Sequence, residues 1–237
     1  MKIIVPDYYY DFNCIADKCK HTCCKGWEVE IDEASIKRFE QIPDVERRIE
    51  RGEDNHFRLL EGDVCPFLLE NGLCDMIIKY GEDFLCQTCT DHPRFRNYWE
   101  DRVEMGLGMV CEEAARLILS RKSPMKLVVY ESDETDVSKE LPEDELWLMN
   151  FRDNMLRENP EEGPIARFRE YLIYRHIADA LYDDSLEERV NFIDDMVEMV
   201  KKRWQESDGT MESLIEIVRI FSYDIEYDED EKEKYLA

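Results

Sequence analysis

Cysteine is the residue type whose number and spacing in this chain point most directly to chemistry. All nine cysteines lie in the first 111 of 237 residues: Cys14, Cys19, Cys23, Cys24, Cys65, Cys74, Cys86, Cys89 and Cys111. Thiolates bind soft or borderline metals, and a structural site normally combines four ligands from separate parts of the chain. We therefore predict a metal centre in the cysteine-rich half, which runs from Cys14 to Cys111.

The spacing of the cysteines leaves the metal open. Cys23 and Cys24 are adjacent, and two neighbouring thiolates rarely serve one tetrahedral zinc, although they could reach two metals or two corners of a larger cluster. The single C-x2-C, formed by Cys86 and Cys89, lacks the second copy that a zinc ribbon would have. The spacing also differs from that of bacterial ferredoxins. Buried thiols without a metal are the alternative, because cysteine also behaves as a small hydrophobe in protein cores.

Charge and hydropathy exclude several classes of partner. The chain has 57 acidic and 31 basic side chains and a formal net charge of -26, which repels phosphate backbones and anionic lipid heads. We expect no nucleic acid and no membrane partner, since no apolar run approaches the roughly 20 residues of a membrane span. No targeting segment is evident either. We expect a cytoplasmic protein, in which clustered cysteines are metal ligands or redox groups rather than disulfides.

The predicted fold is mainly α, with a cysteine-rich, loop-rich metal-binding half followed by an α-helical half. The boundary is placed in the polar, acidic stretch ESDETDVSKELPEDE, which contains Pro142 and suits a loop. The predicted organisation is a cysteine-rich domain over 1–125, an acidic linker or loop over 126–145 and an acidic helical domain over 146–237.

Apolar periodicity predicts the helices that would position these residues. Steps of three and four place apolar side chains on one helical face from Val190 to Trp204, from Ile165 to Leu181 and from Met211 to Phe221. Shorter helices are predicted in the first half, and the alternating segment WEVEI is predicted as a short strand. These segments are 33–40, 75–85 and 112–119 for the helices and 27–31 for the strand.

Four segments carry a resemblance to a known family. YYYDFNCIADKCKHTCCKGWEVEID, CPFLLENGLCDMI, GEDFLCQTCTDHPRF and VCEEAARLIL resemble, in this order, the flagellin lysine-N-methylase family. That family is related to the YkgJ-type cysteine-cluster proteins, which are described as zinc- or iron-chelating. Weaker similarity continues through FREYLIYRHI and IFSYDIEYDEDEKEKYL.

The resemblance implies an iron–sulfur protein that transfers methyl groups from S-adenosylmethionine to lysine side chains, with flagellin or a similar protein as substrate. A 4Fe–4S cluster is preferred and zinc is the alternative. Cys86 stands where relatives have Ser, so the resemblance leaves it outside the ligand set. The metal ligands that the resemblance implies are Cys14, Cys19, Cys23, Cys24, Cys65, Cys74, Cys89 and Cys111.

Catalytic and donor-binding residues are not identified by the sequence. Glu104 is predicted to be solvated, Arg94 to be structural, and the tyrosines at 8–10 to pack in a core or interface. His92 is not predicted to bind metal, because thiolates are plentiful. Gly106 and Gly108 do not complete a dinucleotide-binding fingerprint, which disfavours a Rossmann-type methyltransferase.

Three functions remain from different classes. The first is a cluster-dependent protein lysine N-methyltransferase. The second is a non-catalytic zinc- or iron-binding module with a structural, storage or partner-binding role, and the third is an iron–sulfur electron carrier.

Overall fold

The computed structural model describes residues 2–131, 142–183 and 185–236, and it divides the chain into two compact units. Unit 1 consists of Met1–Asn13 and Pro93–Ala237, and unit 2 of Cys14–His92. The sequence places its boundaries at 125 and 145 instead. They differ because Leu127–Glu131, inside the predicted linker, joins a sheet with strands that precede it, and because residues on both sides of the linker share one core. The predicted linker lies partly on 132–141, outside the described residues.

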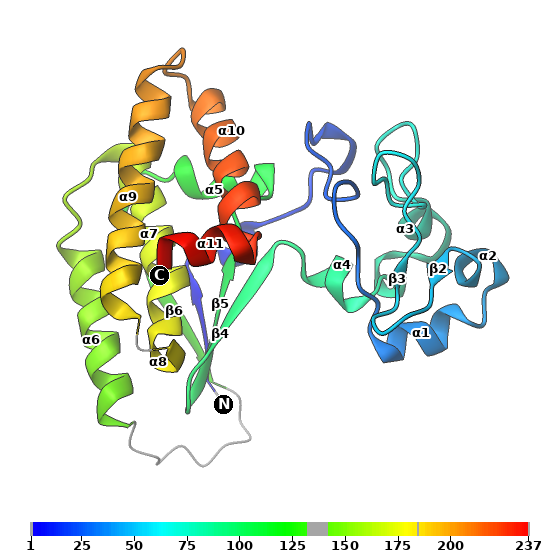
Figure 1. The fold of residues 1–237 in the computed structure, drawn as a ribbon, viewed down its shortest axis with the longest axis horizontal. Helices are drawn as coiled ribbons and strands as arrows, with labels where there is room; N and C mark the ends of the chain where they lie inside the picture. Colours follow the sequence, from blue (N-terminus) through cyan, green and yellow to red (C-terminus); the bar gives the residue numbers. More distant parts are fainter. Residues whose placement is uncertain (1, 132–141, 184, 237) are drawn as a thin grey trace. The chain divides into compact units, whose positions relative to one another are not determined.

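A four-stranded sheet is the centre of unit 1 (Figure 1). Its strand order is β4 (Arg94–Tyr98), β5 (Arg102–Leu107), β1 (Lys2–Pro6), β6 (Leu127–Glu131). β1 runs parallel to β5 and antiparallel to β6, and β4 runs antiparallel to β5. The first strand of the chain therefore pairs with segments about a hundred residues away, which ties 1–13 to the C-terminal part.

Helices complete unit 1. Those predicted over 112–119, from Val190 to Trp204 and from Met211 to Phe221 are confirmed, whereas the helix predicted from Ile165 to Leu181 ends at His176 and Leu181 lies on a separate short helix. They are α5 (Glu112–Leu119), α6 (Glu143–Arg157), α7 (Gly163–His176), α8 (Ala180–Asp183), α9 (Leu186–Gln205), α10 (Met211–Phe221) and α11 (Glu229–Leu236). Figure 1 shows α6, α7 and α9 side by side next to the sheet. The Thr210 side chain caps α10 by accepting a hydrogen bond from Ser213 N at 3.2 Å. Apolar residues of α5, α7, α9 and α10 share one core with the sheet.

Unit 2 has short elements and a core of its own. Its helices are α1 (Glu33–Phe39), α2 (Pro43–Glu46), α3 (Asp75–Tyr80) and α4 (Gln87–Asp91), and its strands are β2 (Ile49–Glu50) and β3 (His56–Phe57). Phe57 lies at the centre of the core, with ring centroids 5.9 Å from Phe39 and 5.1 Å from Phe67. The helix predicted over 75–85 ends at Tyr80. The strand predicted over 27–31 is wrong and is reduced to a bridge between Glu30 and His56.

The chain is thus mainly α-helical with a small sheet. Of the helices in the described ranges, none is long and apolar enough to cross a bilayer.

A glycine on β5 is required by the aromatic residue opposite it. Gly106 pairs with Phe95 of β4, and a Cβ atom at Gly106 would overlap the Phe95 ring. We expect Gly106→Ala to lower the free energy of unfolding by about 1–3 kcal/mol, the usual cost of overpacking. Gly52→Ala, where the nearest atom to the new Cβ is 3.5 Å away, is the matched control. Urea unfolding of both variants checks this, and equal stabilities would contradict it.

Candidate functional site

The first cysteine pair in unit 2 is brought together by a backbone contact between distant segments. Cys65 N donates to Cys24 O at 2.8 Å, and Lys25 forms a bridge with Val64. Cys23 lies one residue before Cys24, and its carbonyl accepts a hydrogen bond from the Trp27 indole at 2.8 Å. Segments 23–25 and 64–65 therefore present their thiols to the same region.

Cys74 reaches that region because the chain between Cys65 and Cys74 folds back on itself. Leu68 N donates to Cys65 O at 3.1 Å, and Leu68 forms a bridge with Cys74. The return passes through Gly72 at a φ of +80°, a conformation that favours glycine. Cys74 then precedes α3.

The C-x2-C pair is positioned by a carboxylate that serves two helices. The two oxygens of Asp32 accept from Ser35 N, at the start of α1, and from Gln87 N, at the start of α4, each at 2.9 Å. Cys86 is the residue before α4 and Cys89 lies within its first turn, so both thiols lie on the same side of this short helix. Cys86 is fully buried.

The environment of Cys24 favours its thiolate form. The pKa of Cys24 is lowered to about 3, chiefly because the Cys23 and Cys65 thiols hydrogen-bond to its sulfur. The same contact raises the pKa of Cys65, and burial raises the pKa of Cys74. Since the thiolate is the form that binds metal, Cys24 is the best prepared ligand of this group.

In the C-x2-C pair, Cys86 and Cys89, one thiol likewise has a lowered pKa and the other a raised one. A hydrogen bond between the two thiols lowers the pKa of Cys86 and raises that of Cys89, and burial and the neighbouring Cys86, Cys24 and Cys65 raise the pKa of Cys89 further. The structure therefore brings six thiols of unit 2 into electrostatic contact. They are Cys23, Cys24, Cys65, Cys74, Cys86 and Cys89.

The other three cysteines lie in different surroundings. Cys14 is exposed and its sulfur accepts a hydrogen bond from Ala16 N at 3.4 Å, while the Cys19 thiol donates to His21 O at 3.0 Å. Cys111 belongs to unit 1, where it precedes α5 and packs against that unit's core. The structure thus brings together five of the eight predicted ligands, and Cys86 with them.

As donors, these thiols fit iron or zinc, both of which accept thiolate ligands. Within the described ranges, however, no three His, Cys, Asp or Glu side chains are arranged to hold one ion. The ligand set and the metal therefore stay predictions.

The aromatic and basic residues that flank the cysteines in the sequence have mostly packing contacts. The Arg94 guanidinium lies over the rings of Tyr9 and Phe12, at 5.7 and 5.5 Å from their centroids. Tyr9 and its neighbour Tyr8 are buried as predicted, whereas Tyr10 is 65% exposed. The His92 ring lies 6.1 Å from that of Trp27.

The prediction that Glu104 is solvated is wrong. Glu104 on β5 and Arg152 on α6 are 0% and 1% exposed and form a two-pronged ion pair, one contact being Arg152 Nη2 to Glu104 Oε1 at 3.0 Å. The guanidinium also lies over the rings of Trp99 and Tyr174. This pair joins β5 of the sheet to α6.

A second polar centre in unit 1 was missed by the sequence prediction. Glu226, on a π-helical turn (Ser222–Glu226) after α10, is buried at 4% exposure. Its carboxylate accepts from Tyr171 Oη at 2.7 Å, contacts His176 Nε2 at 2.7 Å and lies 3.3 Å from Arg175 Nε. π-helical turns are rare and frequent at functional sites.

The protonation states in this centre follow from burial and from these contacts. Burial alone would raise the pKa of Glu226, but Arg175 and His176 lower it to about 2. Burial lowers the pKa of His176 despite the nearby carboxylate, so the ring is neutral and its Nε2–H donates to Glu226. Burial also raises the pKa of Tyr171 well above its ordinary value.

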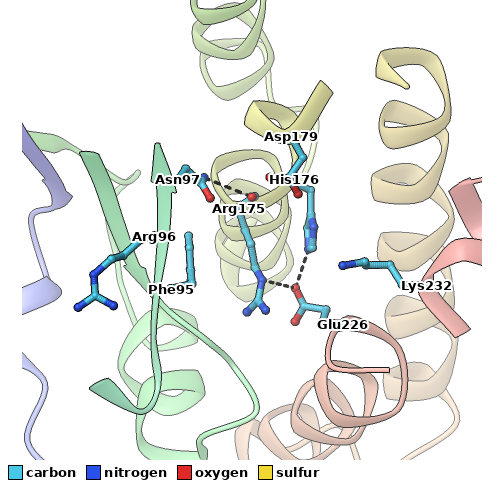
Figure 2. Close-up of a pocket in the computed structure, with 8 residues that line it drawn as sticks. All are labelled: Phe95, Arg96, Asn97, Arg175, His176, Asp179, Glu226 and Lys232. Atoms are coloured by element: carbon cyan, nitrogen blue, oxygen red, sulfur yellow. Dashed lines mark hydrogen bonds and ion pairs between the residues drawn. The ribbon is translucent and has the colours of Figure 1, made fainter. Parts of the chain in front are cut away.

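A cavity of about 180 Å³ opens beside this centre (Figure 2). Figure 2 shows Phe95 and Asn97 on one side and Lys232 of α11 on the other, with Glu226 between. Arg96 also borders the cavity, but its side chain points away from it.

The sequence carries only faint signals of this site. Tyr171 and Arg175 are four residues apart on α7, a spacing that places them on one helical face. Glu226 stands within an acidic segment, YDIEYDEDE, which is indistinguishable from a solvated tail until its partners are known.

Comparisons with known proteins give three relatives. A lysine-N-methylase of Salmonella choleraesuis and one of Salmonella typhimurium are each 26% identical over 136 residues, which is 52% of this chain and 33% of theirs. The flagellar biosynthetic protein FliU of Salmonella muenchen is 27% identical over 135 residues, 52% of this chain and 79% of FliU. Protein-family models and solved structures give no match.

The matched part of this chain therefore spans about a third of the length of the two lysine-N-methylases. These matches confirm the predicted relationship to the flagellin lysine-N-methylase family.

Proposed function

We propose that this relative of the flagellin lysine-N-methylases is a protein lysine N-methyltransferase that uses an iron–sulfur cluster. Its substrate would be flagellin or a similar lysine-bearing protein, and its methyl donor S-adenosylmethionine. The observation that carries the proposed reaction is the similarity to two lysine-N-methylases. The name of the third supports a flagellar substrate.

The thiol-rich region of unit 2 supports the proposed cluster. Residues that would hold it include Cys24, whose environment favours the thiolate, and Cys65, Cys74 and Cys89 nearby. When bound, such a cluster supplies redox-active iron. Clustered thiols remain reduced in the cytoplasm, which is the location we propose.

The charge of the chain supports a cationic substrate. Methyl transfer needs a neutral lysine amine held in line with the methyl group, so the enzyme must bind the lysine and receive its proton. A net charge of -26 raises the local concentration of a lysine-rich surface.

Anaerobic purification with iron, sulfide and zinc analysis tests the cluster. We expect iron and acid-labile sulfide in the wild type. Cys24→Ser should lower metal affinity by more than the roughly 10–100-fold that follows the loss of an outer-shell partner. Cys86→Ser is the matched control, because Cys86 lies outside the predicted ligand set. Zinc in a colourless protein would contradict the iron–sulfur proposal, and equal iron loss in both variants would place Cys86 among the ligands.

Mass spectrometry of flagellin tests the reaction separately. Incubation with the cluster-loaded chain and S-adenosylmethionine should add methyl groups to lysines, and Cys24→Ser should abolish this. If the loaded chain leaves flagellin unmodified, the binding-module alternative is favoured. Reversible bleaching on reduction without methylation would favour the electron carrier.

A further inference from the structure

The cavity in unit 1 has two carboxylates on its wall, and each lies beside a guanidinium. Glu226 is paired with Arg175 and hydrogen-bonded by Tyr171 and His176. Asp179, the other carboxylate on the wall, lies 3.3 Å from Arg189, which also pairs with Asp183. The wall carries three cationic side chains against these two carboxylates, so its balance of charge is positive: Arg96, Arg175 and Lys232.

The Arg175 guanidinium is held in place by this network. It lies between the rings of Phe95 and Tyr227, at 5.0 and 4.8 Å from their centroids, and Nη1 donates to Tyr171 Oη at 2.7 Å. Its position is thereby fixed before any ligand arrives, which lowers the cost of binding.

Lys232 is a cation on the wall for which the structure gives no ion pair among the side chains that it describes, which do not include that of Glu229. By contrast Lys234, two residues on, pairs with Glu231. Figure 2 shows the Lys232 side chain extending from α11 toward His176 and Glu226. Lys232 is half-buried, and its ammonium group carries three hydrogen-bond donors that can face a ligand on this wall.

The cavity wall therefore offers a ligand positive charge and hydrogen-bond donors, and the Phe95 ring adds an apolar surface. A volume of about 180 Å³ is below the roughly 300–1,000 Å³ of pockets for drug-sized ligands. We propose that this cavity binds a small organic carboxylate, with its oxygens on Lys232 and its carbon chain toward Phe95. The proposal does not rest on the proposed methyl transfer, and the site lies in the unit that lacks the six-thiol group.

Two sources of a carboxylate fit this chemistry, a free small acid or the amino-acid end of a larger molecule. Titration of the full-length chain with acetate, L-methionine and S-adenosylmethionine, followed by calorimetry and by NMR of labelled lysine, separates them. We expect saturable binding of acetate or L-methionine and a shift of the Lys232 signal. Tight binding of S-adenosylmethionine alone would assign the site to the larger molecule.

Variants on α11 test the role of Lys232. Lys232→Met keeps the side-chain stem and should weaken carboxylate binding about 10-fold or more, the equivalent of a lost charge-assisted hydrogen bond. Lys232→Arg and Lys234→Met should stay within about threefold of the wild type. None of the three should change the metal content of the purified protein. The proposal is overturned if methylamine binds in place of acetate, if no probe binds, or if Lys234→Met weakens binding as much as Lys232→Met.

Discussion

Replacing Arg152 with Met is expected to lower the free energy of unfolding by about 3–5 kcal/mol. The reason is that Glu104, which is 0% exposed, would keep its charge in the core without a counter-ion. Arg157→Met is the matched control, because Arg157 lies on the same helix but is exposed, and it should change stability by less than about 0.5 kcal/mol. Chemical unfolding followed by circular dichroism provides the measurement.

The double variant Glu104→Leu with Arg152→Met separates a missing charge partner from lost packing. Replacing both members of a buried ion pair with apolar side chains is often close to neutral. We therefore expect the double variant to be more stable than Arg152→Met alone. A double variant that is as unstable as the sum of the two single variants would show that the charges do not interact.

Acid should remove the stabilisation that Glu226 provides. Its pKa falls from 4.5 to about 2 on folding, so the unfolded state binds more protons between these values. Stability from this group is therefore complete above about pH 4.5 and is lost as the pH falls toward 2. The shift corresponds to about 3 kcal/mol, since one pKa unit is about 1.4 kcal/mol.

The effect of Glu226→Gln is best measured in a His176→Gln background. His176 has a lowered pKa, so it also destabilises the fold as the pH falls below about 6.5, and replacing it removes that contribution. Because His176 is one of the groups that lower the Glu226 pKa, we expect the stability lost through Glu226→Gln in this background to be below about 3 kcal/mol near pH 6 and to shrink further as the pH falls to 3. Glu206→Gln, at an exposed carboxylate, should give a small and nearly constant difference. A difference for Glu226→Gln that does not change with pH would disprove the linkage.

Features that depend on local order could be predicted from the sequence. Apolar periodicity identified α9 and α10, and the segment EEAARLIL formed α5 with the predicted bounds, because a helix closes its hydrogen bonds within itself and shows its buried face every three or four residues. The thiols of Cys23 and Cys24 and of the C-x2-C pair were visible as a group because they are neighbours along the chain. The family relationship followed from motifs of this kind.

Which distant segments meet became visible only in the folded chain. The four-stranded sheet was missed because β4 and β5 carry Arg94, Arg96, Asn97 and Glu104, so their pattern reads as polar. Glu104 is buried only because Arg152 lies opposite it, and Glu226 only because Arg175, His176 and Tyr171 surround it. A charged side chain on its own predicts solvent, since its burial is costly until a partner from elsewhere in the chain compensates the charge. The number and spacing of the cysteines are read from the sequence. The backbone contact between Cys24 and Cys65, which brings two distant cysteine segments together, is seen only in the folded chain.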